Sequence, residues 1–130
     1  MSDRILIDTS VWIDYFQNGA VSEKLDDMLS GGNVYVPMVV IAELIHGARS
    51  EKEIAVIKDF VEAFTIIDQK EDTWLEAGRL AYRLKKKGKT TNLTDCYIAI
   101  IARDSGCRIL TLDKHFKEIQ KEFGIMLERF

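Results

Sequence analysis

Four acidic side chains each border an apolar segment of the chain. They are Asp8, Glu43, Asp95 and Asp113. Carboxylates that converge without a partner repel one another, and this repulsion raises their pKa values. A hard divalent cation that prefers oxygen ligands, Mg²⁺ or Mn²⁺, relieves the repulsion and keeps waters that can attack a phosphodiester. These residue types therefore point to metal-dependent hydrolysis of a phosphate ester, provided that the fold brings them together.

Asp8 and Asp113 each follow an apolar run that is typical of a buried strand. Residues 5–7 precede Asp8, and residues 107–112 precede Asp113. Ligands of open α/β sheets bind beyond the carboxyl ends of the strands, which is where both aspartates are expected. Thr111 is expected to leave its strand on the same side as Asp113. Either aspartate has an alternative role as the cap of the helix that follows.

Asp95 and Glu43 lie in segments that are predicted to be helices. Asn92 is expected to cap the helix of Asp95, and Asp95 itself is alternatively a capping carboxylate. Residues 96–102 are apolar on all sides, which predicts a helix that is buried nearly all round. Glu43 follows the apolar residues 39–42, where an unpaired carboxylate costs free energy. Alternatively, Glu43 opens the solvent-facing side of its helix.

Three further groups of polar or reactive residues have weaker claims to a function. His46 lies one turn beyond Glu43, but a lone histidine on a helix is more often a surface residue than a metal ligand. The cations of segment 79–89 could hold phosphates, although the helix dipole also favours cations at the C-terminal end of a helix. Cys96 and Cys107 lack metal-ligand spacing and are predicted to be reduced thiols in the core.

Strands and helices are predicted to alternate along the whole chain, which indicates a parallel sheet with helices on both faces. Strands are expected at 5–7, 34–36, 65–68, 107–112 and 125–127, and helices at 11–18, 21–30, 38–49, 51–64, 71–87, 93–105 and 114–123. Thr9 or Ser10 is expected to cap the helix that begins at Val11. The buried side of the helix at 71–87 is expected to carry Trp74, Ala77, Gly78, Ala81 and Leu84.

The length of 130 residues fits a single domain, 1–130, and 47% hydrophobic with 30% charged residues is ordinary for a soluble globular protein. The net charge of −3 argues against a wholly basic nucleic-acid surface. It does not exclude a nuclease, because an acidic metal site contributes to that total. The chain shows no signal peptide and no apolar run long enough to cross a membrane, so a cytoplasmic location is expected.

Four segments resemble the acidic motifs of the PIN-domain ribonucleases. They are Ile7-Asp8-Thr9-Ser10, Ala42-Glu43-Leu44, Thr94-Asp95-Cys96-Tyr97-Ile98-Ala99 and Thr111-Leu112-Asp113-Lys114-His115-Phe116. The segments occur in the order of the family and extend over nearly the whole chain. The resemblance implies a three-layer, PIN-like α/β fold, with a short, mostly parallel central sheet flanked by helices. The short single-domain length resembles the VapC toxins of type II toxin–antitoxin pairs.

The resemblance implies a Mg²⁺-dependent (or Mn²⁺-dependent) endoribonuclease that hydrolyses phosphodiester bonds of RNA. It implies that Asp8 and Asp95 are the principal metal ligands, and that Glu43 and Asp113 complete the shell or orient the attacking water. Thr111 resembles the hydroxyl residue that often accompanies the fourth carboxylate. Many relatives have a proline shortly before the third acidic residue, and this chain lacks it, which concerns the shape of that loop.

The resemblance also implies a homodimer and a cognate antitoxin protein whose tail occupies a groove. The first two predicted helices, 11–18 and 21–30, are candidates for those surfaces. Three alternatives remain open: a PIN-domain nuclease of RNA maturation, a phosphatase with an aspartate nucleophile, and a non-catalytic binding module. The phosphatase usually needs a second aspartate where this chain has Ser10, and the presence of all four carboxylates argues against the binding module.

Overall fold

The computed structural model describes residues 4–17, 19, 22–67 and 70–128, which form five strands and seven helices. The strands are β1 (Ile5–Ile7), β2 (Val34–Pro37), β3 (Thr65–Ile67), β4 (Arg108–Leu110) and β5 (Met126–Leu127). The helices are α1 (Thr9–Phe16), α2 (Ser22–Ser30), α3 (Met38–His46), α4 (Glu51–Val61), α5 (Thr73–Lys86), α6 (Leu93–Ser105) and α7 (His115–Glu122). Strands and helices alternate, which confirms the predicted α/β class.

All five strands run parallel, in the order β3-β2-β1-β4-β5. The central strand β1 pairs on one side with β2, where Ile5 lies opposite Val34, and on the other side with β4, where Ile7 lies opposite Leu110. All three residues of β1 are apolar and buried, as expected for the middle of a parallel sheet. Asp8 therefore lies at the centre of the edge formed by the carboxyl ends of the strands.

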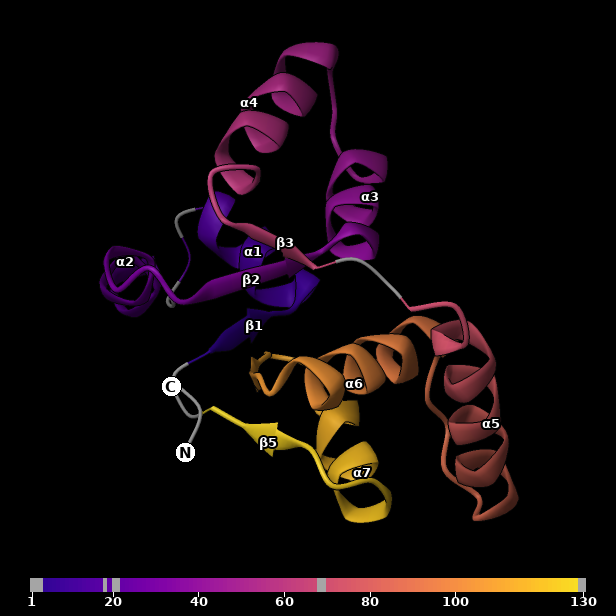
Figure 1. Ribbon diagram of the computed structural model, residues 1–130. Coiled ribbons are helices and arrows are strands. Elements are labelled where there is room, and N and C mark those ends of the chain that lie inside the picture. Colours follow the sequence, from indigo (N-terminus) through magenta and orange to yellow (C-terminus); the bar gives the residue numbers. More distant parts are fainter. Residues whose placement is uncertain (1–3, 18, 20–21, 68–69, 129–130) are drawn as a thin grey trace.

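The helices flank the sheet in two groups (Figure 1). One group lies beyond β2 and β3 and contains α3 and α4, while α5, α6 and α7 lie together at the other end of the molecule. Helix α1 packs against α3, and α6 packs against both α5 and α7. All seven residues from 96 to 102 of α6 are buried, which confirms the predicted apolar helix. None of the helices in the described ranges combines the length and apolar character needed to span a bilayer.

An aromatic cluster fixes α1 against α4. The indole of Trp12 is fully buried and stacks on Phe16 with a centroid separation of 6.0 Å. It also meets the rings of Phe60 and Phe64 at 5.8 and 6.0 Å, and Tyr15 lies 5.6 Å from Phe60. The aromatic face of α1 is therefore occupied by packing against α4 and the residues after it.

Two boundaries near the acidic residues differ from the prediction. Helix α1 begins at Thr9, two residues earlier than predicted, because Asp8 already occupies the N-cap position. Strand β4 ends at Leu110, so Thr111 and Asp113 lie in the loop before α7 and not in the strand. Both shifts put more polar side chains in loops and first helical turns at the carboxyl edge of the sheet.

Two burial predictions for α5 were wrong, because Gly78 and Trp74 are both exposed, and three predicted boundaries lie outside the described residues. Trp74 is 37% exposed, because its indole stacks flat on Tyr97 with the centroids 4.0 Å apart and leaves its other face open. Ala77, one turn later, is fully buried as expected. Asp68, the predicted last residue of the third strand, Val21, the predicted first residue of the second helix, and Asn18, the predicted last residue of the first helix, all lie outside the described residues.

Candidate active site

Asp8 is a buried carboxylate that follows the central strand. Its exposed fraction is 3%, and this burial raises the pKa of the carboxyl. Hydrogen bonds from the hydroxyls of Thr111 and Ser10, and from the backbone N–H groups of Thr9 and Ser10, offset part of that rise. Asp8 occupies the N-cap position of α1, and the two backbone N–H groups belong to the first turn of that helix. The carboxylate therefore lies at the start of α1 and at the carboxyl edge of the sheet.

Two hydroxyl groups from distant parts of the chain hold the same oxygen of Asp8. Ser10 Oγ and Thr111 Oγ1 each donate a hydrogen bond of 2.8 Å to Asp8 Oδ2. Thr111 Oγ1 also accepts a hydrogen bond of 3.0 Å from the backbone N–H of Asp113. Ser10 Oγ accepts one of 3.0 Å from the backbone N–H of Leu112. The loop after β4 is thus tied to the end of β1, which brings Asp113 to Asp8.

Asp95 is the most perturbed carboxylate of the group. It lies in the first turn of α6, where its backbone N–H donates to the Asn92 side chain over 2.7 Å, so Asn92 is the cap and the carboxylate of Asp95 is not. The side chain is 6% exposed, and its Oδ2 atom is buried with no hydrogen-bond partner among the described residues. Burial, followed by the negative charges of Asp8 and Asp113, raises the pKa of Asp95 to about 7.

Asp113 lies beside Asp95 and is joined by His115. Ligand atoms of these three residues all lie within 4.8 Å of one another. His115 Nδ1 is 3.0 Å from Asp113 Oδ1, and the backbone N–H of His115 donates to the same oxygen over 2.9 Å. Sequence reasoning assigned no role to His115. The available signal was its position two residues after an aspartate, where its backbone and imidazole both reach the carboxylate.

Glu43 reaches the same edge from α3. Its side chain is exposed, and its Oε1 accepts a hydrogen bond of 2.8 Å from Thr9 Oγ1. Its charge contributes, less than those of Asp8 and Asp113, to the raised pKa of Asp95. Glu43 is therefore an exposed residue of its helix, as one interpretation predicted, and it also faces the acidic cluster. Contacts thus connect Asp8, Thr111, Asp113 and Asp95, whereas Glu43 reaches the same edge through Thr9, the residue after Asp8.

The weaker candidates lie elsewhere or are already engaged. His46 is exposed at the end of α3 and does not belong to the cluster around Asp95. In segment 79–89, Lys87 and Lys89 form ion pairs with carboxylates of α7, which fits the structural role of this basic cluster. Cys96 and Cys107 are buried free thiols, as predicted, and burial raises the pKa of both.

The donor set fits a divalent cation. Asp95 presents a buried oxygen that no donor from the described part of the chain satisfies, which costs free energy unless a cation or a proton is present. The surrounding carboxylates disfavour a further negative charge, and a cation removes that repulsion. Three or four carboxylates at one open edge suit an ion that prefers oxygen ligands and keeps part of its water.

Comparison with known proteins identifies the family of this chain. A model of the PIN domain matches residues 5–122. The chain belongs to the PIN domain family. Ribonuclease VapC1 of Methanocaldococcus jannaschii is 31% identical over 124 residues, which cover 95% of this chain and 86% of that protein. The tRNA(fMet)-specific endonuclease VapC of Shigella flexneri is 26% identical, and the match covers 96% of each chain.

Solved structures share the fold of this PIN domain. A chain of the DNA-bound VapBC complex of Salmonella typhimurium superposes with a TM-score of 0.80 at 24% identity, and the match covers 96% of each chain. VapBC2 of Rickettsia felis, bound to a fragment of its promoter, gives a TM-score of 0.79 at 22% identity and covers 97% of this chain and 98% of that one. The five-stranded parallel sheet flanked by helices is therefore the PIN-like fold that the sequence predicted.

Proposed function

We propose that this PIN domain is a metal-dependent endoribonuclease that acts as the toxin of a VapBC-type toxin–antitoxin pair. The observation that carries the proposal is the buried, unpartnered oxygen of Asp95 among the negative charges of Asp8, Asp113 and Glu43. Relatives with the names of ribonucleases match this chain over nearly its whole length, which supports RNA as the substrate.

The carboxylates have distinct roles in this proposal. Asp8 and Asp95, the two buried members, are the principal ligands of Mg²⁺ or Mn²⁺. Asp113 and Glu43, which are more exposed, complete the shell or orient the attacking water. The bound ion supplies charge stabilisation to the phosphate oxygens and acidifies a water. Thr111 fixes the orientation of Asp8, so its hydroxyl acts through that carboxylate.

The decisive experiment compares RNA cleavage by the purified chain in Mg²⁺, in Mn²⁺ and in a chelator. Cleavage is expected with either ion and is expected to stop when the ion is removed, because the acidic site then lacks its electrophile. Asp8→Asn and Asp95→Asn are expected to give folded proteins that do not cleave RNA. Undiminished cleavage by both variants, or equal cleavage in the chelator, would refute the proposed site.

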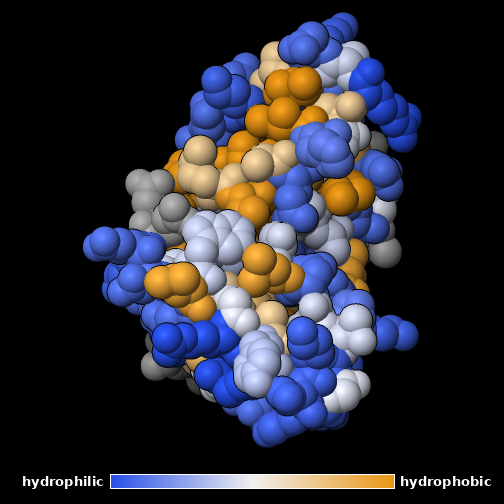
Figure 2. Space-filling view, turned by 90° about the vertical axis from the view of Figure 1, so that its right-hand side faces the viewer, coloured by the Kyte–Doolittle hydropathy of each residue, from blue (hydrophilic) through white to orange (hydrophobic). Residues whose placement is uncertain are grey.

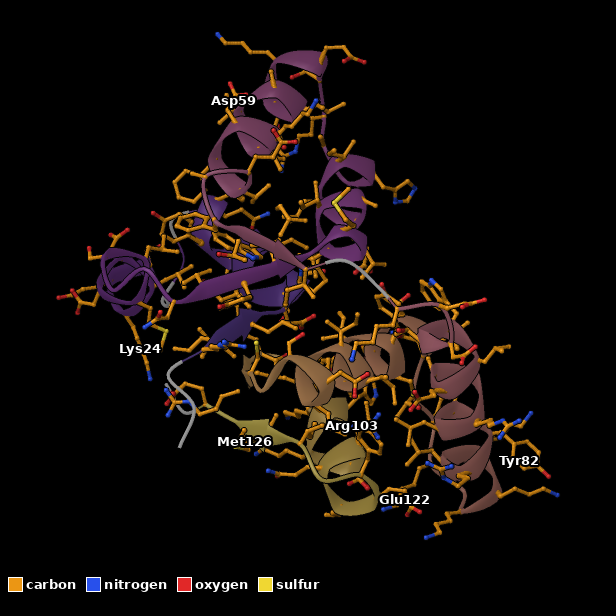
Figure 3. All side chains as sticks on the ribbon, viewed as in Figure 1. Lys24, Asp59, Tyr82, Arg103, Glu122 and Met126 are labelled. Carbon is orange, nitrogen blue, oxygen red and sulfur yellow. The ribbon has the colours of Figure 1, made fainter. Side chains whose placement is uncertain are left out.

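A matched control separates loss of the site from loss of charge. Asp59 lies on α4, far from α7 and the acidic edge (Figure 3). Asp59→Asn removes the same charge as Asp95→Asn and is expected to retain full cleavage. If Asp59→Asn lost activity to the same extent, then net charge and not the acidic site would explain the effect.

An apolar groove next to the site suits the antitoxin partner. It has a volume of about 490 Å³ and lies between α1, α3 and α4, with Ile13 and Val56 on its walls and Glu43 at its border. These two side chains are 45% and 56% exposed, and apolar side chains gather at this end of the molecule (Figure 2). An antitoxin segment in this groove would lie next to the acidic edge. Of the first two predicted helices, α1 therefore supplies the candidate surface, and a homodimer remains part of the proposal.

The toxin role is separable from a role in RNA maturation. Expression of the chain alone is expected to stop growth, and co-expression of a small DNA-binding protein encoded next to it is expected to restore growth. A nuclease of RNA maturation would instead be tolerated without such a partner. Growth that is unaffected by an active chain would leave the nuclease assignment intact and remove the toxin assignment.

A further inference from the structure

A second hollow borders the acidic site on the side away from the apolar groove. It has a volume of about 750 Å³ and lies between the loop after β4, helix α7 and the end of β5. Thr111 and Asp113 form the wall that it shares with the acidic site. The lysine side chains of Lys114, Lys117 and Lys121 line the α7 side. A chain that enters this hollow therefore meets cations on one side and the carboxylates at its end.

The acidic residues Glu118 and Glu122 of α7 are paired with lysines from another part of the chain. Glu122 accepts an ion pair of 2.6 Å from Lys87, and Glu118 accepts one of 3.0 Å from Lys89. Both lysines come from the segment that joins α5 to α6, and Glu122 lies on the α5 side of α7 (Figure 3). These pairs hold α7 against the connection between α5 and α6, while the lysines of α7 line the flank that borders the hollow.

The positive charges of the lysines on that flank are neutralised little or not at all by nearby carboxylates. All three are exposed, and no ion pair within the described ranges involves Lys114 or Lys117. Lys121 lies 3.3 Å from Glu118, which already pairs with Lys89 at a shorter distance. An exposed ion pair of this kind contributes little to stability, so Lys121 can readily bind another anion in place of Glu118.

The carboxylates that border the hollow are also engaged. Glu128 pairs with Arg108 over 3.0 Å, and Asp113 belongs to the acidic site and pairs with His115. The hollow therefore has an excess of positive charge in a chain whose net charge is −3. Such a concentration of lysines directly beside a metal site suits a polyanion whose reacting phosphate lies at the carboxylates.

We infer that the α7 flank is the phosphate-binding track for the RNA strand next to the scissile bond. This inference rests on the proposed ribonuclease function. Lys117 and Lys121, spaced by one helical turn, contact successive phosphates of the strand, and Lys114 contacts the phosphate nearest the acidic site. Exposed Leu112, on the same wall, offers apolar surface to a base. The track binds the backbone and does not read the sequence.

The test measures binding of a short fluorescein-labelled single-stranded RNA as a function of salt, in the cleavage-deficient Asp95→Asn protein with Mg²⁺. Lys117→Ala/Lys121→Ala is expected to weaken binding roughly tenfold at low salt. The slope of log K against log salt is expected to fall by about 1.4, since each phosphate contact on a single strand contributes about 0.7. The control Lys52→Ala/Lys58→Ala removes two exposed lysines of α4, at the opposite end of the molecule, and is expected to change neither quantity.

Kinetics of the otherwise wild-type chain complete the test. Lys117→Ala/Lys121→Ala is expected to raise KM and to leave kcat and the thermal midpoint nearly unchanged, because the lysines position the strand and do not touch the reacting atoms. The phosphate-binding track would be overturned if the slope of log K against log salt did not change, or if the α4 control lost as much RNA affinity. Cleavage of RNA by the wild-type chain would still uphold the proposed function in either case. Absence of both cleavage and RNA binding in the wild-type chain would instead remove the proposed function itself.

Discussion

Thr111 Oγ1 donates a hydrogen bond of 2.8 Å to Asp8 Oδ2, across 103 positions of sequence. The same hydroxyl oxygen accepts the backbone N–H of Asp113 over 3.0 Å. One side chain therefore orients the buried carboxylate after β1 and fixes the loop that carries a second carboxylate. Ser10 adds a further hydrogen bond of 2.8 Å to the same oxygen of Asp8.

Thr111→Val removes this link while it preserves the shape of the side chain. Cleavage is expected to fall by about 10- to 100-fold in kcat/KM, since a hydrogen bond to a charged group contributes about 1.5–3 kcal/mol. Thr111→Ser keeps the hydroxyl and is expected to retain most of the activity. The measurement is steady-state RNA cleavage at saturating Mg²⁺. Equal rates for Thr111→Val and the wild-type chain would show that the hydroxyl does not position Asp8.

Local sequence patterns identified the carboxylates better than the groups that hold them. Asp8 follows an apolar strand and Asp95 opens an apolar helix, so each is marked by its own neighbours. The contacts of Thr9 with Glu43 and of Ser10 with Asp8 were missed, because a hydroxyl after a strand is equally typical of a helix cap. The burial of Asp8 before α1 shifted both hydroxyls into the helix and turned them toward the site.

The pKa of Asp95 predicts how the stability of the metal-free protein depends on pH. Burial raises this pKa to about 7, above the value of the unfolded chain, so the folded state retains a proton that the unfolded state has lost. The contribution of Asp95 to stability is therefore full below about pH 4 and is lost as pH rises through about 7. In a chelator, Asp95→Asn is expected to melt at a higher temperature than the wild-type chain at pH 8, by on the order of 5 °C.

Calorimetry at several pH values and with added metal checks this prediction. The difference in melting temperature between Asp95→Asn and the wild-type chain is expected to grow between pH 4 and 7 and then to level off. Mg²⁺ is expected to narrow the difference, because the ion binds the folded wild-type site and stabilises it by mass action. If the difference in melting temperature stayed constant with pH, or if Mg²⁺ left it unchanged, Asp95 would not be a carboxylate of raised pKa that binds the ion.

The same limit of local patterns explains the errors in the fold. The periodicity of α5 placed Trp74 and Ala77 on one buried side, and Ala77 is fully buried. Trp74 lies near the start of the helix, where it stacks on the ring of Tyr97 from α6 and remains 37% exposed. Strand order and the contact between these helices depend on long-range packing, which a single helical pattern does not encode.

His115 is predicted to orient Asp113 for metal binding. His115→Gln removes the imidazole that lies 3.0 Å from Asp113 Oδ1 and is expected to weaken metal binding by about tenfold, as is typical when a partner of a metal-binding residue is lost. Titration of Mn²⁺ followed by electron paramagnetic resonance measures the affinity directly. His46 is the other histidine of the chain, and His46→Gln is expected to bind Mn²⁺ like the wild-type protein. Equal Mn²⁺ affinities for all three proteins would show that the contact between His115 and Asp113 does not contribute to metal binding.

The apolar groove between α1, α3 and α4 is predicted to bind the antitoxin. Val56→Asp places a charge on an exposed residue of its wall, so burial of that wall by a partner would require desolvation of an unpaired carboxylate. The variant is expected to cleave RNA normally and to escape inhibition by the co-expressed antitoxin. Glu62→Gln, a change just beyond the end of α4, is expected to stay inhibited. Full inhibition of Val56→Asp would place the partner on another face. Loss of cleavage by Val56→Asp would instead mean that the groove supports the acidic edge through Glu43, which borders both.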